Sequence, residues 1–106
     1  MTTIAMTPPH ACFSSVASYY VTHRERGPFH TTVLTDAGYA FASWYGVHSG
    51  GEGIFQRRAE RWCVLVNTGG ALNVDEMVRY GVPRPTAQRL FDRMQTVFAK
   101  RERERA

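Results

Sequence analysis

The sequence predicts an α+β fold in which an N-terminal helix, a four-stranded antiparallel sheet, a short helix and a long C-terminal helix follow one another. Three observations support this class. Apolar residues recur at helical spacing near both ends of the chain, β-patterned segments lie between them, and the turns joining those segments are too short for parallel strands. Such clustering predicts helices packed on one face of the sheet, with a cystatin-like arrangement as one candidate.

The N-terminal helix is expected over roughly residues 8–23. Its first turn tolerates Pro8 and Pro9, since the N–H group that proline lacks has no partner there, and Thr7 can cap it. Gly27 and Pro28 end the helix. One apolar stripe lies between these limits, at Phe13, Val16, Ala17 and Tyr20.

The strands are expected at residues 31–34, 39–45, 52–58 and 62–67. Residues 35–38 read as a turn in which Gly38 can adopt a positive φ, and Ala59-Glu60 as a tight turn. Segment 39–45, with the sequence YAFASWY, carries apolar side chains on both faces, which indicates a central strand.

The periodicity becomes helical after the last strand. Asn73 and Glu76 form a capping-box pattern for a short helix that ends at Gly81. Pro85 suits the first turn of the last helix, and a charged, flexible tail is expected at about residues 100–106 of a single domain, 1–106. The apolar stripe of that helix contains Ala87, Leu90, Phe91, Met94, Val97 and Phe98.

The composition limits the class of protein. The 106 residues suit one domain, and a net charge of +4 permits binding to nucleic acid or to an acidic protein. The sequence has no apolar run long enough to cross a membrane and no signal-peptide pattern, so a cytoplasmic location is expected, with a processed exported form as the alternative. Cys12 and Cys63 would be thiols in the cytosol and a disulfide in an exported chain.

Motifs for catalysis or phosphate binding are weak. The sequence contains no GxSxG, HExxH or P-loop pattern, so the expectation is a protein without catalytic residues. Gly50-Gly51 leads into a strand rather than a helix, and Asp75 and Glu76 beyond Gly69-Gly70 would repel an anion. Both glycine pairs are therefore interpreted as residues that allow tight turns, not as parts of a ligand site.

Two alternative chemistries depend on His, Cys and Arg. His10, Cys12 and His48 could bind copper, although His48 with Glu52 alone provides too few ligands for a metal site. Trp44 and Trp62 could stack on bases beside arginines, but a core role is preferred. Nucleic acid is the less favoured partner, because the C-terminal charges alternate in sign.

Part of the chain, roughly residues 40–90, resembles a family of small bacterial proteins described as copper-uptake-system-associated. The resemblance implies that the two glycine pairs fix the hairpin geometry and the crossing from the sheet to the helix. It lies in the patterns Ala42-x-Trp44, Gly50-Gly51-x-Gly53-Ile54-Phe55-x-Arg57-Arg58, Trp62-x-Val64, Gly69-Gly70-Ala71-Leu72 and Gly81-Val82-Pro83-x-x-x-Ala87-x-x-Leu90.

These observations favour a small accessory or regulatory protein that binds a partner protein, with a homodimer as a further possibility. Copper handling and nucleic-acid binding are the alternatives. The expected surface combines the glycine-rich loop 46–53 with the neighbouring hairpin, because loops carry function more often than strands do. Its residues are His48, Gly50, Gly51, Glu52, Arg57, Arg58 and Arg61.

Overall fold

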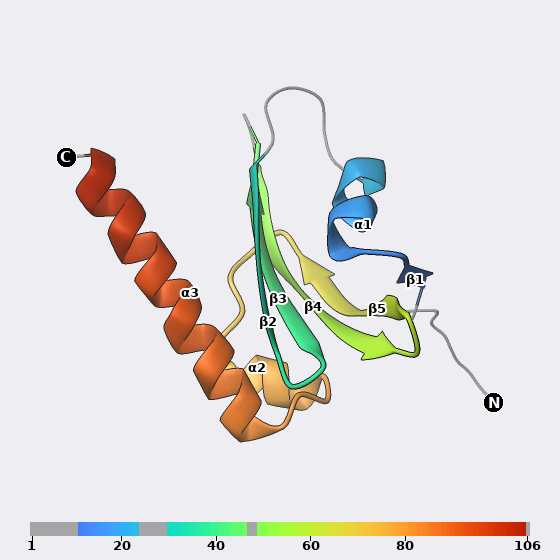
Figure 1. Ribbon diagram of the computed structural model, residues 1–106. Coiled ribbons are helices and arrows are strands. Elements are labelled where there is room, and N and C mark those ends of the chain that lie inside the picture. The colour runs from blue at the N-terminus through green and yellow to red at the C-terminus, as the bar shows by residue number, and fades with distance from the viewer. Residues whose placement is uncertain (1–10, 24–29, 47–48, 106) are drawn as a thin grey trace.

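The computed structural model describes residues 11–23, 30–46 and 49–105. Within these ranges five strands form one antiparallel sheet, in the spatial order β1-β5-β4-β3-β2 (Figure 1). The α+β class and the antiparallel sheet predicted from the sequence are confirmed. No helix in these ranges is long and apolar enough to cross a lipid bilayer. In chain order the elements are β1 (Cys12–Phe13), α1 (Val16–His23), β2 (His30–Asp36), β3 (Tyr39–Tyr45), β4 (Gly50–Arg58), β5 (Arg61–Thr68), α2 (Val74–Arg79) and α3 (Arg84–Arg105).

The fifth strand, β1, lies where the sequence predicts a helix. It pairs antiparallel with β5, and α1 begins only after it. Ser15 caps α1, because its Oγ accepts a hydrogen bond from the N–H of Ser18 at 2.9 Å. The predicted helix is therefore wrong over residues 11–15, and its first residues lie outside the described ranges.

Helices cover both faces of the sheet. The prediction that all helices pack on one face is wrong: α1 lies on one side of the sheet, and α2 and α3 lie on the other (Figure 1). Strand β3 explains this arrangement, because its alternate side chains are apolar on both faces. On the α1 side, Val16 and Tyr20 pack with Ala40, Ala42 and Phe55; on the α3 side, the buried cluster is Phe41, Ile54, Leu72, Met77, Val82, Ala87, Leu90 and Met94.

Two tight turns set the register of the sheet. Ala37 and Gly38 have φ angles of 52° and 85°, which is the pattern of a type I′ hairpin between β2 and β3. Ala59, with φ of 55°, starts the turn between β4 and β5. Both turns predicted from the sequence are confirmed.

The helical end of the chain follows the predicted order. Asn73 and Glu76 form the capping box of α2: Asn73 Oδ1 accepts from the N–H of Glu76, and Glu76 Oε1 accepts from the N–H of Asn73. Gly81, with φ of 110°, separates α2 from α3. Helix α3 continues to Arg105, through most of the segment for which a flexible tail is expected.

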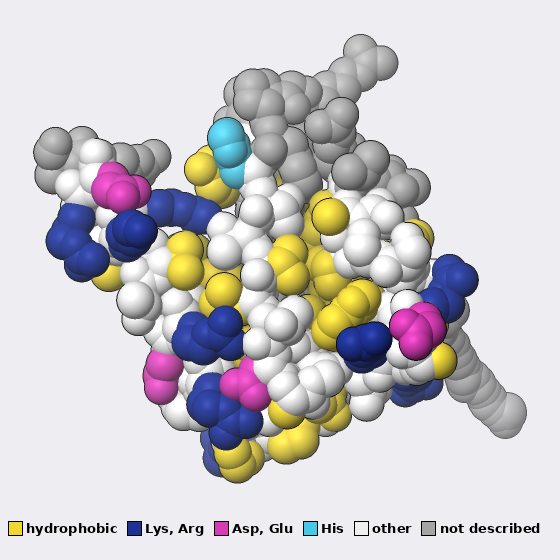
Figure 2. Space-filling model, in the orientation of Figure 1, with side chains coloured by type: hydrophobic (Ala, Val, Ile, Leu, Met, Phe, Trp, Pro, Cys, Tyr) yellow, Lys and Arg dark blue, Asp and Glu magenta, His cyan; other side chains and the backbone are white. Residues whose placement is uncertain are grey.

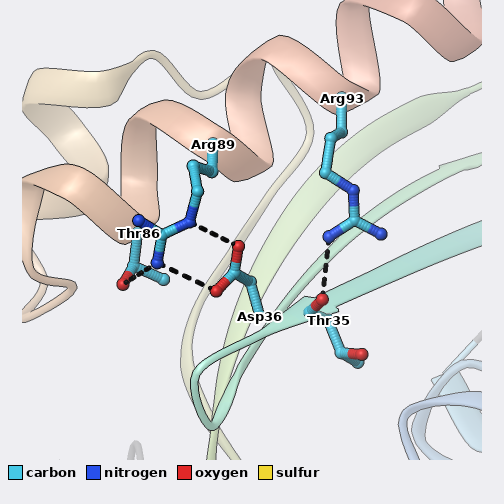
Figure 3. A network of polar contacts seen from close by, with 5 residues as sticks. All are labelled: Thr35, Asp36, Thr86, Arg89 and Arg93. Atoms are coloured by element: carbon cyan, nitrogen blue, oxygen red, sulfur yellow. Dashed lines mark hydrogen bonds and ion pairs between the residues drawn. The ribbon is translucent and has the colours of Figure 1, made fainter.

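Arginines of α3 fix this helix along β2 (Figure 3). Arg89 donates from Nε and Nη2 to the two carboxylate oxygens of Asp36, at 2.8 and 3.0 Å. Arg93 donates from Nη1 to the carbonyl oxygen of Thr35 at 2.8 Å. The hydrogen bond from Arg89 holds the pKa of the Asp36 carboxyl below its usual value. Because the Arg89 side chain is largely exposed, these contacts orient α3 more than they stabilise the fold.

Candidate functional site

The structure separates the two parts of the surface expected from the sequence. Gly50, Gly51 and Glu52 begin β4, whereas Arg57 and Arg58 end it. An extended strand places Glu52 and Arg58 about 20 Å apart, so the glycine-rich start and the basic end of β4 do not form one patch. His48 lies outside the described residues.

Arg57, Arg58 and Arg61 are exposed at the β4–β5 turn, and we call these three residues the arginine hairpin. Arg57 lies 3.5 Å from a carboxylate oxygen of Glu60. Arg61 donates to the carbonyl oxygen of Cys12 at 2.9 Å. The hairpin is therefore a basic surface, and two of its side chains also donate hydrogen bonds to backbone carbonyl oxygens: Arg57 to Ala59 and Arg61 to Cys12.

The glycine-rich start of β4 is required by close packing. A methyl group at Gly51 would lie 2.0 Å from the carbonyl oxygen of Thr68, and one at Gly53 would lie 2.5 Å from the Tyr20 hydroxyl oxygen. Real Cβ atoms do not approach other atoms so closely. These glycines thus let the end of β5 and helix α1 approach the strand.

An open groove runs between α3 and the sheet beside these glycines, and we call it the α3 groove. It consists of three adjoining hollows, of about 500, 330 and 460 Å³, and Phe98 lines each of them. Its lining includes Tyr45, Glu52, Gly70, Phe91, Phe98 and Arg101. Glycines 50, 51, 69 and 70 line the central hollow, so backbone forms much of its floor.

Arg101 lies at one end of the α3 groove between two aromatic rings. Its guanidinium carbon is 5.5 Å from the ring centre of Tyr45 and 5.8 Å from that of Phe98. It also donates to the hydroxyl of Thr32 in β2. The ring of His30 stacks on Tyr45 at 4.8 Å. This end of the groove therefore combines one cation with an aromatic wall.

Glu52 is a buried carboxyl in the same groove. Only 7% of the residue is exposed, and Oε1 accepts a hydrogen bond from the N–H of Leu72 at 2.6 Å. Burial raises the pKa of this carboxyl and the nearby Glu76 carboxylate raises it further, whereas the Leu72 hydrogen bond lowers it. Glu52 thus ties the loop after β5 to β4 and places a titratable group in the groove.

We expect Glu52→Gln to make the protein more stable at neutral pH and to leave its stability at acid pH little changed. The folded chain holds the Glu52 proton more tightly than the unfolded chain, so the free energy of unfolding falls as pH rises from the unfolded pKa, about 4.3, through the raised folded pKa. A glutamine side chain can still accept the hydrogen bond from the Leu72 N–H, but it does not titrate and so removes this pH dependence. Urea unfolding across this range tests the expectation, with the exposed Glu104→Gln as control. An equal effect of Glu52→Gln at acid and neutral pH would contradict it.

The candidate metal ligands are only partly described. His10 and His48 lie outside the described residues, and Cys12 forms a disulfide with Cys63. In this oxidised form the Cys12 sulfur is not a thiolate ligand. Among the described residues, no group of three or more His, Cys, Asp or Glu side chains is placed to hold a metal ion.

The two tryptophans pack in the α1 layer. Trp44 and Trp62 are partly buried against the cluster that contains Tyr20 and Phe55. The ring centres of Trp44 and Tyr20 are 6.3 Å apart. This placement suits the core role preferred from the sequence over a stacking platform for bases.

Sequence reasoning missed Tyr45, Phe98 and Arg101 as site residues. Tyr45 belonged to the pattern of a central strand, and Phe98 to the apolar stripe of a helix. One signal was available, because Phe98 and Arg101 are three residues apart and so lie on one helix face. Their approach to Tyr45 depends on how α3 crosses the sheet, which the sequence pattern does not contain.

No protein-family model, curated protein or solved structure matches this chain. The resemblance to copper-uptake-system-associated proteins therefore stays a prediction.

Proposed function

We propose that this chain is a small non-catalytic accessory protein that docks on a partner protein, and that the α3 groove with the adjoining start of β4 is its main docking surface. The arginine hairpin, at the other end of β4, would be a separate basic contact. The observation that carries the proposal is the open groove with an aromatic wall and a glycine floor.

The shape of the groove favours a protein over a small ligand. Small-molecule sites enclose most of their ligand, whereas the hollows here are open along the helix. Tyr45 is 41% exposed and gives the wall an aromatic contact of the kind enriched at protein interfaces. The glycine floor lets a partner main chain approach closely.

Charge disfavours a nucleic acid in this groove. Carboxylates line each of its hollows and would repel phosphates: Glu102 and Glu104 at one end, Glu52 in the middle, and Glu76 at the other end. The arginine hairpin lies at the far end of β4 and does not add to the charge of the groove. The same surface accepts the mixed charges of a protein segment.

The disulfide supports an oxidising location. A bond between Cys12 and Cys63 persists in exported proteins and is rare in the reducing cytosol. We therefore favour the exported form over the cytoplasmic location expected from the sequence.

The proposal is tested by blocking the floor of the groove without disturbing the fold. A methyl group at Gly70 would meet no atom within 4 Å, so Gly70→Trp places a large side chain over the floor. Tagged wild-type and variant chains are used to capture proteins from the native host, and bound proteins are quantified by mass spectrometry. We expect to capture a stoichiometric partner with the wild type and to lose it with Gly70→Trp. The control Glu60→Gln, which changes an exposed residue outside the groove, should retain this partner.

Capture that is unchanged by Gly70→Trp and by Tyr45→Ser would overturn the groove as the docking surface. Loss of the partner in an Arg58→Ser, Arg61→Ser chain alone would move the contact to the arginine hairpin.

A further inference from the structure

Strand β2 forms one outer edge of the sheet and lacks the usual features that protect such an edge. Edge strands are commonly short, or carry prolines, bulges or central charges that prevent another strand from pairing. The segment His30–Asp36 has no proline, pairs with β3 without a bulge, and has its carboxylate at the turn end. Its centre is uncharged, and Val33 is 37% exposed. β2 is therefore a flat template for a further strand.

The hairpin geometry shows which backbone groups of β2 face outward. In a two-residue hairpin, Asp36 and Tyr39 form the first hydrogen-bonded pair, and alternate residues then point their N–H and C=O groups away from β3. These outward residues are Thr35, Val33 and Thr31. The hydrogen bond from Arg93 to the Thr35 carbonyl oxygen agrees with this alternation. Thr31 and Val33 thus offer donors and acceptors to an incoming strand.

A line of arginines flanks this edge on the α3 side. Figure 2 shows Lys and Arg side chains gathered along α3, next to the sheet. Asp36 forms an ion pair with Arg89 and also attracts the nearby Arg93. Arg93 and Arg101 donate hydrogen bonds to the uncharged oxygens of Thr35 and Thr32. Because these two acceptors are three residues apart, the two guanidinium groups reach β2 about 10 Å apart along the strand. The opposite side of the edge carries Val33, whose cross-strand partner is Ala42 of the α1 layer.

We propose that β2 receives an extended segment of a partner protein as a sixth strand, in which acidic residues alternate with apolar ones. The backbone of the segment pairs with Thr31 and Val33. Its carboxylates face Arg93 and Arg101, and its apolar side chains pack beside Val33. This proposal rests on the proposed function, because it describes how the partner protein would be held. The contact it describes lies at the edge of the sheet, not on the floor of the α3 groove.

The charges disfavour a second copy of this chain as the occupant. Pairing two β2 strands antiparallel about a two-fold axis would place both α3 helices on the same face of the joined sheet. Arg93 and Arg101 of one copy would then face the same arginines of the other, which is a like-charge contact. An acidic segment relieves this repulsion and fits the charge complementarity of the edge.

A blocked peptide of repeated Glu-Val units tests the proposal, with a Lys-Val peptide as the charge control. We expect the Glu-Val peptide to slow amide hydrogen exchange at Thr31 and Val33. Val33→Pro removes an outward N–H group without breaking a β2–β3 bond, and we expect it to weaken peptide affinity about tenfold or more. Arg93→Gln with Arg101→Gln weakens the affinity and reduces its salt dependence, whereas Arg79→Gln with Arg84→Gln, which removes two exposed charges away from this edge, does not.

Equal binding of the Lys-Val peptide, or unchanged affinity of the Val33→Pro chain, would overturn the proposal. Concentration-dependent protection of Thr31 and Val33 without peptide, with a dimer in sedimentation, would assign the edge to a second copy instead. The two proposals can fail independently, because Gly70→Trp tests binding at the floor of the α3 groove and Val33→Pro tests binding at the β2 edge.

Discussion

Joint substitution of Cys12→Ser and Cys63→Ala lowers the free energy of unfolding by about 2–5 kcal/mol. The disulfide joins two residues 51 positions apart, so it removes many conformations from the unfolded chain. In the chain-entropy description, a loop of this length corresponds to about 4 kcal/mol. This is one of the two largest effects that we expect from small changes to the chain.

The disulfide also determines how firmly the N-terminal layer is held. Strand β1 has two residues, and beyond them the N–H of Val64 donates to the Ala11 carbonyl oxygen at 3.0 Å. So short a pairing is marginal without a cross-link. Loss of the disulfide should therefore loosen α1, which packs through Val16 and Tyr20, before it affects the α3 side of the sheet.

Urea unfolding of the oxidised wild type, the reduced wild type and the double variant measures this effect. The reduced wild type is the control for packing, because Cys63 is buried and Cys63→Ala also removes a side-chain contact. Hydrogen exchange shows whether α1 loses protection first. Equal stability of oxidised and reduced wild type would contradict the expectation, and free thiols in protein isolated from its host would remove the support for an oxidising location.

The sequence patterns predicted local structure well where a single rule decides it. Segment 39–45 has the bounds of β3, and the Asn73–Glu76 capping box starts α2 as expected. In both cases, alternation or side-chain capping acts within a few residues. The predicted helix over residues 8–23 was wrong at Cys12 and Phe13, because pairing with β5 outweighs helix periodicity there.

The placement of helices could not be predicted in the same way. The pattern of β3 already contained Ala40 and Ala42 on one side and Phe41 on the other, so coverage of both faces of the sheet by helices could have been predicted. Which helix covers which face depends on long-range packing. For the same reason the arginine hairpin and the glycine-rich start of β4 were expected to adjoin, although strand length alone separates them.

Gly51→Ala has the second large expected effect, a loss of about 3 kcal/mol or more in the free energy of unfolding. The added methyl group would lie 2.0 Å from the Thr68 carbonyl oxygen and 3.0 Å from the Gly69 Cα. Both are backbone atoms, so the clash cannot be relieved by rotating a side chain. The start of β4 and the end of β5 must therefore move apart. Gly70→Ala is the matched control, because its methyl group meets no atom within 4 Å and should change stability by about 0.5 kcal/mol at most.

Thermal unfolding of the two variants, with hydrogen exchange at the end of β5, decides whether this close approach exists in solution. If Gly51→Ala destabilises the chain and Gly70→Ala does not, the two glycine pairs have different roles: the first lets two strands meet, and the second leaves the floor of the α3 groove open. Separation of β4 from β5 would also expose the Glu52 carboxyl to water. Because burial is the main cause of its raised pKa, the variant should lose the pH dependence that Glu52 gives the wild type. A stable Gly51→Ala chain with that pH dependence intact would show that the strands are not in contact at Thr68, and the floor of the groove would then be wider than the structure places it.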